Sequence, residues 1–125
     1  MNNLPVIGIT MGDPAGIGPE IIAKAFADES IFEGCRPVVL GDPGALDLAM
    51  GGKAAIKIRE IEQPPEALGA RDFLDVIPVC RLEKDCLVPG FPRVEGGVAM
   101  VDCIIRAVEM AMKGEIAAMV TCPIN

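Results

Sequence analysis

Apolar residues occur along the chain in short runs, several of which do not alternate with polar residues. Residues 6–10 and 116–120 are such runs, and residues 38–40 form another within the strand predicted at residues 36–40. They are typical of strands inside a parallel sheet that has helices over both faces. Residues 53–61 alternate instead, which predicts a strand with one solvated face, and residues 73–79 predict a further strand after the Pro64-Pro65 turn. The pattern therefore predicts an α/β fold on a mostly parallel sheet.

Helical patterns separate these strands. Helices are predicted at residues 19–26, 45–50 and 97–113, and residues 80–96 are predicted to be a loop because of their prolines and glycines. The longest helix carries one apolar stripe, which we expect to cover the sheet. The stripe comprises Val98, Val101, Ile104, Ile105, Val108 and Met112.

The last apolar strand, residues 116–120, is followed only by residues 121–125. A doubly wound sheet needs helices over both faces, and none follows this strand in the sequence. We therefore expect residues 1–125 to be the N-terminal portion of a longer α/β/α subunit, with the second half and the remaining domain outside this chain.

Charge and composition exclude several classes of partner. The net charge of −7 would repel a phosphodiester backbone, and four Phe with no Trp or Tyr leave few rings for base stacking. No apolar stretch approaches the roughly 20 residues of a membrane-spanning helix, and the first residues lack the pattern of a signal peptide. We expect no nucleic-acid partner, no membrane association and a cytoplasmic location.

Cysteine and histidine usage narrows the chemistry. The five cysteines are irregularly spaced without a C-x-x-C pair, so we expect reduced and mostly buried thiols rather than disulfides or a zinc site. The sequence has no histidine, the usual general base and metal ligand. No catalytic residue and no metal ligand is therefore predicted within this segment.

Candidate binding residues lie in the loops that follow the strands. In open α/β sheets, ligands bind beyond the carboxyl ends of the parallel strands, so residues 11–18, 41–44 and 121–125 are expected along one rim. Gly12, Gly16 and Gly18 either expose backbone amides to a phosphate at a helix N-terminus or simply allow a tight turn. The sequence leaves both readings open.

The polar residues of these loops have similar alternatives. Asp13 could hold a substrate hydroxyl or a metal-bound water, or it could accept hydrogen bonds from its own loop, as Asp before Pro commonly does. For Asp42 the capping role is favoured. Thr121 and Asn125 follow the last strand, where polar groups can reach a ligand, whereas Cys122 lacks a neighbouring base and is predicted to be an inert thiol.

Residues 9–20, Ile-Thr-Met-Gly-Asp-Pro-Ala-Gly-Ile-Gly-Pro-Glu, resemble the opening signature of the 4-hydroxythreonine-4-phosphate dehydrogenase family (PdxA). Residues 38–42, 109–114 and 120–125 resemble later elements of that family in the same order. The resemblance implies a three-layer α/β/α fold similar to that of the isocitrate and isopropylmalate dehydrogenases.

The resemblance also implies an activity. Family members are homodimers that use NAD or NADP and a divalent metal such as Zn, Mg or Co to oxidise 4-hydroxythreonine 4-phosphate, a small phosphorylated hydroxy acid, in vitamin B6 biosynthesis. Their metal ligands lie beyond the counterpart of this chain, so the isolated segment is expected to be inactive. It would supply one wall of the substrate or cofactor cleft. The residues expected there are Gly12, Asp13, Gly16, Gly18, Thr121 and Asn125.

Two other functions remain open. Residues 11–13 and 122–125 also resemble a subgroup that oxidises threonate or erythronate 4-phosphate in sugar-acid catabolism. A function of a different class is a non-catalytic phosphate-binding or dimerisation module, which the absence of histidine favours.

Overall fold

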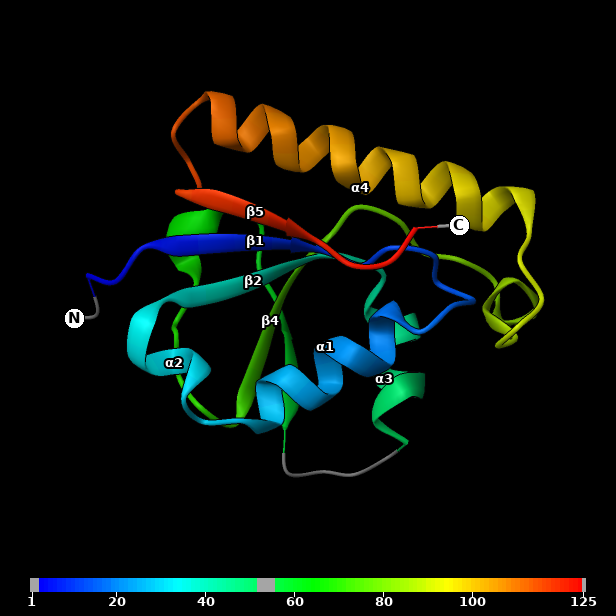
Figure 1. Cartoon of the computed structure of the whole chain (residues 1–125), viewed down its shortest axis with the longest axis horizontal. Helices are drawn as coiled ribbons and strands as arrows, with labels where there is room; N and C mark the ends of the chain where they lie inside the picture. Colours follow the sequence, from blue (N-terminus) through cyan, green and yellow to red (C-terminus); the bar gives the residue numbers. More distant parts are fainter. Residues whose placement is uncertain (1–2, 52–55, 125) are drawn as a thin grey trace.

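A parallel β-sheet forms the centre of the computed structural model, which describes residues 3–51 and 56–124 (Figure 1). Within these residues five strands lie in the order β3-β4-β2-β1-β5, and all neighbouring pairs are parallel. The first strand therefore lies between β2 and β5, with Gly8 opposite both Val38 and Met119. The strands are β1 Val6–Thr10, β2 Arg36–Gly41, β3 Lys57–Glu60, β4 Phe73–Pro78 and β5 Ala118–Thr121.

Helices cover both faces of this sheet. Figure 1 shows α1, α2 and α3 on one face and the long α4 on the other. These helices are α1 Gly18–Ala27, α2 Ile31–Gly34, α3 Pro43–Met50 and α4 Val94–Met112. The three-layer α/β/α architecture predicted from the sequence is confirmed, and among the described residues the sheet is wholly parallel.

Two hydrophobic cores separate the layers. On the α1 side, Ile22, Phe26 and Leu46 are buried in one cluster with Val39 of β2. On the α4 side, Cys103, Ala107 and Met110 are buried in another with Val38 and Leu40. Because successive side chains of a strand point to opposite faces, the unbroken apolar run of β2 serves both cores.

Several predicted boundaries were wrong. Helix α3 begins at Pro43 rather than at residue 45, because Asp42 caps it and Pro43 occupies its first turn. The short helix α2 was not predicted. The predicted loop 80–96 contains the short 3₁₀ helix η2 (Lys84–Leu87) and the start of α4; a further 3₁₀ helix, η1, spans Pro64–Glu66. Of the strand predicted at 53–61, the described residues show β3 at Lys57–Glu60, and residues 52–55 lie outside the described part.

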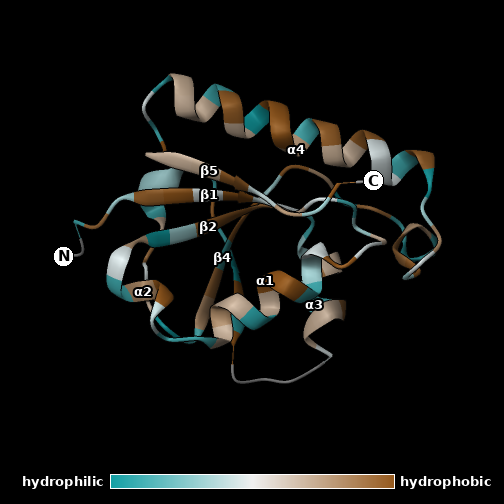
Figure 2. Cartoon of the chain, viewed as in Figure 1, coloured by the Kyte–Doolittle hydropathy of each residue, from teal (hydrophilic) through white to brown (hydrophobic). Residues whose placement is uncertain are grey.

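Helix α4 turns a different face to the sheet from the one predicted. Most of the predicted stripe is exposed, including Val101 at 48% and Met112 at 84%. Small and flexible residues face the sheet instead, and Figure 2 shows hydrophobic colour along α4 as well as on the strands beneath it. The buried residues of α4 are Gly96, Ala99, Met100, Cys103, Ala107 and Met110. Small side chains let the helix axis lie close to the strands, and they therefore form the face of α4 that packs on the sheet. The larger apolar residues form a more regular stripe in the sequence, but that stripe does not face the sheet.

The last strand also differs from its prediction. The apolar run at 116–120 forms a strand only at Ala118–Thr121, and Ala118, Val120 and Thr121 are exposed. Among the described residues, β5 pairs with β1 and lies at the edge of the sheet. No helix in the described part is long and apolar enough to cross a membrane.

Candidate functional site

The loops that follow the strands meet at one edge of the sheet, as its parallel order requires. The amide of Asp13 donates to the carbonyl of Pro123 at 3.3 Å, which joins the loop after β1 to the segment after β5. The amide of Gly90 donates to the carbonyl of Ala15 at 2.9 Å. The loop after β4 therefore joins this rim, although the sequence did not single it out.

Two glycines of the first loop are required by the close packing of the chain on itself. Gly12 has a φ of +76°, and a Cβ atom there would lie 2.4 Å from the carbonyl oxygen of Pro123. At Gly18, a Cβ atom would lie 2.0 Å from the carbonyl oxygen of Met11. Backbone atoms cannot yield as a flexible side chain can, so the tight-turn interpretation explains these two positions without a ligand.

Gly16 is in a different situation. A Cβ atom there would lie 3.3 Å from the carbonyl oxygen of Asp13, which a small adjustment could relieve, and its φ is not positive. Gly16 also lines a cavity of about 520 Å³ between the first loop, the start of α1, α3 and the loop around Pro89. Of the candidate glycines, it is the one that borders this open space.

This cavity has mainly apolar walls. Glu20 is its one charged lining residue, and its carboxylate lies 3.6 Å from the Lys24 ammonium. The first turn of α1 adds the partial positive charge of a helix N-terminus. Such walls suit an apolar group. The apolar walls include Pro14, Ile17, Pro19, Leu48, Leu87 and Pro89.

Asp13 caps its own loop. Its side chain is 8% exposed, and its Oδ1 accepts a hydrogen bond from the amide of Ala15 at 2.9 Å. The carbonyl of Asp13 also accepts from the amide of Gly16 at 2.9 Å. The Asx turn that the sequence left open as one alternative is therefore present. Asp13 is next to Pro14 in the chain, but it is not one of the residues that line the cavity.

Asp42 has the predicted capping role and a second one. Its Oδ1 accepts from the amide of Gly44 at 2.9 Å, which caps α3. Its Oδ2 accepts from the amide of Leu82 at 2.9 Å, which joins the loop after β4 to the end of β2. Asp42 is 2% exposed, so the acceptor of both bonds is buried.

We expect replacement of Asp42 by alanine to lower the free energy of unfolding by about 2–4 kcal/mol, since a cap and a buried partner are lost together. Serine can still cap α3 but cannot reach both amides, so Asp42→Ser should lose about half as much. Urea denaturation of both variants measures the difference. Equal stability of the serine and alanine variants would contradict a contribution from the cap.

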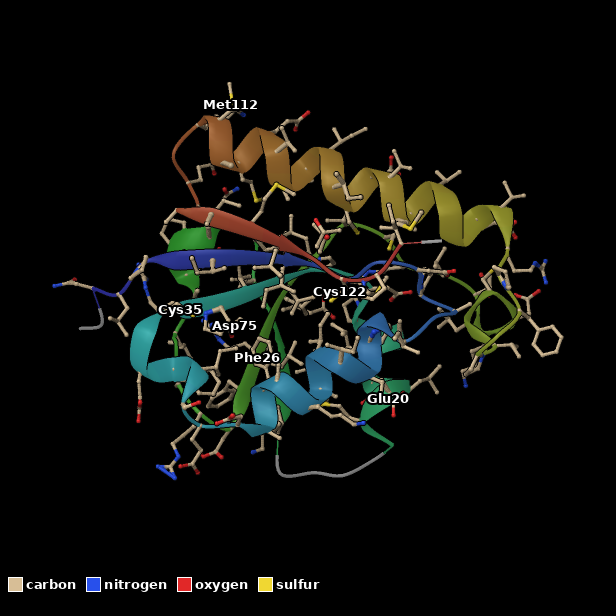
Figure 3. All side chains as sticks on the ribbon, viewed as in Figure 1. Glu20, Phe26, Cys35, Asp75, Met112 and Cys122 are labelled. Atoms are coloured by element: carbon tan, nitrogen blue, oxygen red, sulfur yellow. The ribbon has the colours of Figure 1, made fainter. Side chains whose placement is uncertain are left out.

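The remaining candidates are dispersed. Thr121 is exposed at the end of β5, opposite Thr10, and Asn125 lies outside the described residues. Cys122 is buried beneath the glycine loop, and Figure 3 shows it between the end of β5 and α1. Burial raises the pKa of the Cys122 thiol, which supports the inert-thiol interpretation.

The sequence did not single out Thr10. This residue ends β1 and is fully buried, and among the described residues its Oγ1 is the one buried side-chain oxygen or nitrogen without a hydrogen-bond partner. A threonine at the end of a strand is common, so the sequence carried no signal for this unsatisfied hydroxyl.

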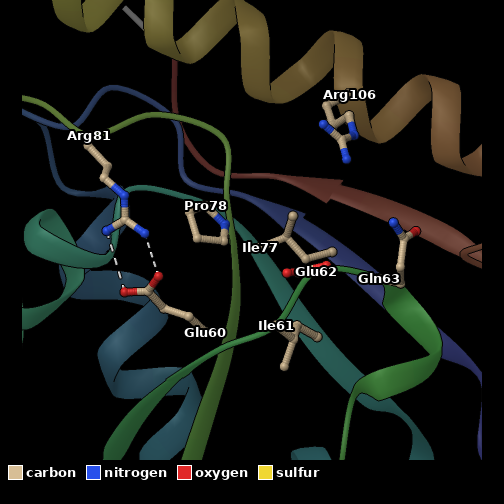
Figure 4. A pocket seen from close by; sticks show the side chains of 8 residues that line it. All are labelled: Glu60, Ile61, Glu62, Gln63, Ile77, Pro78, Arg81 and Arg106. Carbon is tan, nitrogen blue, oxygen red and sulfur yellow. Dashed lines mark hydrogen bonds and ion pairs between the residues drawn. The ribbon is translucent and has the colours of Figure 1, made fainter.

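A second cavity, of about 570 Å³, lies beyond the ends of β3 and β4 (Figure 4). Arg81 forms an ion pair with Glu60 there, and Figure 4 shows Arg106 extending from α4 toward the same space. Acidic and basic groups are mixed around it, so its charge selects no particular ligand. Within residues 3–51 and 56–124 there is no group of three or more His, Cys, Asp or Glu side chains that could hold a metal ion.

Comparison with known proteins decides the family. Residues 33–125 match the family model described as pyridoxal phosphate biosynthetic protein PdxA. The chain belongs to the PdxA family. The family resemblance inferred from the opening signature is thus confirmed.

Similar proteins extend the match to nearly the whole chain. A 4-hydroxythreonine-4-phosphate dehydrogenase of Desulforapulum autotrophicum is 44% identical over 99% of the chain. A Clostridium botulinum protein, provisionally named a D-threonate 4-phosphate dehydrogenase, is 36% identical over 100% of it. The crystal structure of a 4-hydroxythreonine-4-phosphate dehydrogenase from Burkholderia phymatum superposes on 99% of the chain with a TM-score of 0.90 and 42% identity. This PdxA-family chain spans 37–38% of the length of these relatives.

Proposed function

We propose that this PdxA-family chain is the N-terminal portion of an NAD- or NADP-dependent dehydrogenase that oxidises 4-hydroxythreonine 4-phosphate in pyridoxal phosphate biosynthesis. The observation that carries the proposal is the 44% identity, over 99% of the chain, to a protein named for that activity. The fold supports it, since the match to the Burkholderia phymatum structure includes the rim loops.

In this proposal the chain supplies part of a binding cleft. The cavity beside Gly16 would receive a flat portion of the cofactor or substrate, with the N-terminus of α1 near a phosphate. Asp13, Gly12 and Gly18 would shape the loop, and Thr121 and Asn125 would border the cleft at the adjoining rim.

When bound, the nicotinamide would accept a hydride from the secondary alcohol and the divalent metal would stabilise negative charge on its oxygen. The described residues offer no donor set for such a metal. Its ligands, whether for Zn, Mg or Co, would have to come from residues outside this chain. The isolated chain would therefore not catalyse the reaction, and we propose that the complete enzyme is a homodimer.

A specific observation favours a second substrate. The Clostridium botulinum relative, provisionally named for D-threonate 4-phosphate, is 36% identical over the same residues. The second candidate function is therefore oxidation of threonate or erythronate 4-phosphate. Both substrates carry a secondary alcohol and a terminal phosphate, so the rim described here would serve either of them.

The decisive experiment uses the product of the complete natural reading frame. We expect metal-dependent reduction of NAD or NADP with 4-hydroxythreonine 4-phosphate, at a kcat/KM about tenfold or more above that for D-threonate 4-phosphate. A chelator should lower the rate by about 100-fold or more, because metal stabilisation of the alkoxide is worth several kcal/mol. Restoring the divalent ion should recover it.

The other outcomes separate the alternatives. A clear preference for D-threonate or D-erythronate 4-phosphate would replace the proposed substrate with the second one. Phosphate binding without turnover of any of these alcohols would instead favour the non-catalytic module. The 125-residue chain is the matched control, and turnover by it alone would contradict the assignment of the metal ligands to residues outside it.

A further inference from the structure

Two of the five cysteines are neighbours in the structure although they belong to different elements. Cys80 follows the end of β4, and Cys103 lies in the middle of α4 (Figure 1). Cys103 is fully buried in the cluster on the α4 side of the sheet, and the half-buried Cys80 packs against that cluster. The thiol of Cys103 donates a hydrogen bond to the sulfur of Cys80. The two side chains therefore form a dithiol pair between the loop after β4 and α4.

Hydrogen bonds hold the backbone on both sides of Cys80. The amide of Val79 donates to the carbonyl of Gly41 at 3.0 Å, and the amide of Leu82 donates to Oδ2 of Asp42 at 2.9 Å. Both acceptors lie at the end of β2, in the interior of the sheet. The other thiol of the pair is fixed by the helix that carries it. The two sulfur atoms are therefore held next to each other by ordered backbone on both sides.

The other three cysteines have different surroundings among the described residues. The thiol of Cys35 donates to the carbonyl of Ile31 at 3.4 Å, and the thiol of Cys86 donates to Oε2 of Glu95 at 3.4 Å. Cys122 is buried in the cluster on the α1 side of the sheet. An oxidised thiol forms an internal disulfide only where a second thiol lies beside it. In the described part of the chain, the dithiol pair meets that requirement.

Cys80 is the member of the pair that an oxidant can reach, because it is half-buried whereas Cys103 is 0% exposed. The hydrogen bond from Cys103 lowers the pKa of Cys80, against the opposing effects of burial and of the carboxylates of Asp42 and Asp102. The thiolate is the form of cysteine that attacks an oxidant. Donation to Cys80 and burial raise the pKa of Cys103, which therefore keeps its proton.

We propose that Cys80 and Cys103 form a peroxide-sensitive site that closes to a disulfide and is reopened by thiols. In the first step the thiolate of Cys80 attacks one oxygen of hydrogen peroxide. The O–O bond breaks, and the departing hydroxide takes a proton and leaves as water. In the second step the sulfur of Cys103 attacks the sulfenic acid on Cys80. The S–S bond forms, the S–O bond breaks, and the hydroxide leaves as water with the proton of Cys103.

The two steps pass two electrons from the thiols to the peroxide. A disulfide holds its sulfur atoms about 2 Å apart, so the pair must close from hydrogen-bond contact by a small movement of the two side chains. The product ties the loop after β4 to the middle of α4. The same loop contacts the glycine loop through Gly90 and Ala15, so the new bond joins α4 to the rim of the sheet.

Peptide mapping tests the disulfide directly. Trypsin places the two cysteines of the pair in separate peptides, residues 72–81 and 94–106, and Cys86 in a third, residues 85–93. The product of the complete reading frame is treated briefly with hydrogen peroxide, and the remaining thiols are then alkylated. Peptides 72–81 and 94–106 should be recovered linked, two hydrogen masses below their sum, and dithiothreitol should release them.

The variants and the other outcomes are equally specific. Cys80→Ser should abolish the linked peptide, whereas the matched control Cys86→Ser should leave it unchanged. Added oxygen on Cys80 with peptide 94–106 still alkylated would overturn the proposal. Linkage of peptide 72–81 to any other cysteine, or recovery of both thiols unoxidised, would also overturn it. The principal measurement uses the unaltered protein, so it does not depend on the folding of a variant.

The pH dependence of alkylation gives an independent measurement. The rate at which iodoacetamide modifies Cys80 should rise with pH through a midpoint below that of an ordinary thiol, because the thiolate is the reacting form. Cys103→Ala removes the donor and should move this midpoint to higher pH. Cys103→Ser keeps a donor and should hold the midpoint low, while peroxide leaves a sulfenic acid on Cys80 that dimedone traps. An unchanged midpoint in Cys103→Ala would overturn the proposal. None of these readouts depends on which substrate the enzyme oxidises.

Discussion

Replacing Gly18 by alanine should lower the free energy of unfolding by about 3 kcal/mol or more, among the largest effects expected of one added methyl group. The new Cβ would lie 2.0 Å from the carbonyl oxygen of Met11 and 3.2 Å from the Cβ of Cys122. Both belong to packed rim segments, so relief requires the start of α1 to move away from the end of β1. Thermal and urea denaturation would measure the loss.

Gly97 offers a matched control. It lies in helix α4, and a Cβ atom there would have no heavy atom within 4 Å. Gly97→Ala should therefore leave stability unchanged or raise it by about 0.5–1 kcal/mol through helix propensity. If Gly18→Ala proved as stable as Gly97→Ala, the rim loops would not be packed as described here.

The glycine variants also bear on function. Gly12 and Gly18 are explained by contacts with Pro123 and Met11, so their substitution should disturb folding before it disturbs binding. Gly16 borders the cavity and tolerates a Cβ more easily. Any direct contribution of the loop to a ligand is therefore best sought at Gly16.

The sheet could be predicted because each strand carries its signal locally. An apolar run such as residues 6–10 is long enough for a strand and too short for a membrane span. The Gly-Asp-Pro loops after β1 and β2 mark where those strands end. In a parallel sheet the loops that follow the strands lie at the same edge, so these loops could be predicted to lie together without knowing the strand order. The capping role of Asp42 followed equally from local chemistry, since Pro43 begins a helix.

The orientation of α4 could not be predicted in the same way. Its sequence is apolar on two faces, and periodicity alone favours the row of larger residues. Which face of α4 packs on the sheet depends on how close the helix axis lies to the strands and to the loop after β1. Gly96 illustrates this, because a Cβ there would lie 3.1 Å from the side chain of Pro14. That contact depends on tertiary structure, and in the sequence the same glycine suggested a loop.

The cavity was missed for a related reason. Leu87, Pro89 and Gly90 reach it from a segment about 70 residues away from the glycine loop. The hydrogen bond from Gly90 to Ala15 and the burial of Leu87 in one cluster with Met11 bring the two together. Gly90 could be assigned to a turn from the sequence, but nothing in the sequence indicated the loop that it contacts.

A half-buried ion pair joins the edge strand β3 to β4, and its removal should be the other large effect. Arg59 Nη1 lies 3.0 Å from Asp75 Oδ1, and the two residues are partners across β3 and β4. Asp75 is 3% exposed, and its Oδ2 accepts from the amide of Leu68 at 2.8 Å. Arg59→Met should cost about 2–3 kcal/mol, less than for a fully buried pair because the arginine side chain is 34% exposed.

A double-mutant cycle isolates the charge pair from the packing of the arginine stem, which methionine largely keeps. In an Asp75→Asn background the amide of Leu68 retains an acceptor, and Arg59→Met should then cost about 1 kcal/mol or less, a coupling of at least about 1 kcal/mol. The exposed pair of Arg71 and Glu29 is the matched control, where Arg71→Met should cost about 0.5 kcal/mol or less. A coupling near zero would mean that this charge pair adds nothing measurable to the attachment of β3 to β4. A coupling of the expected size would make Asp75 the residue that joins Arg59 of the edge strand and the amide of Leu68 to β4.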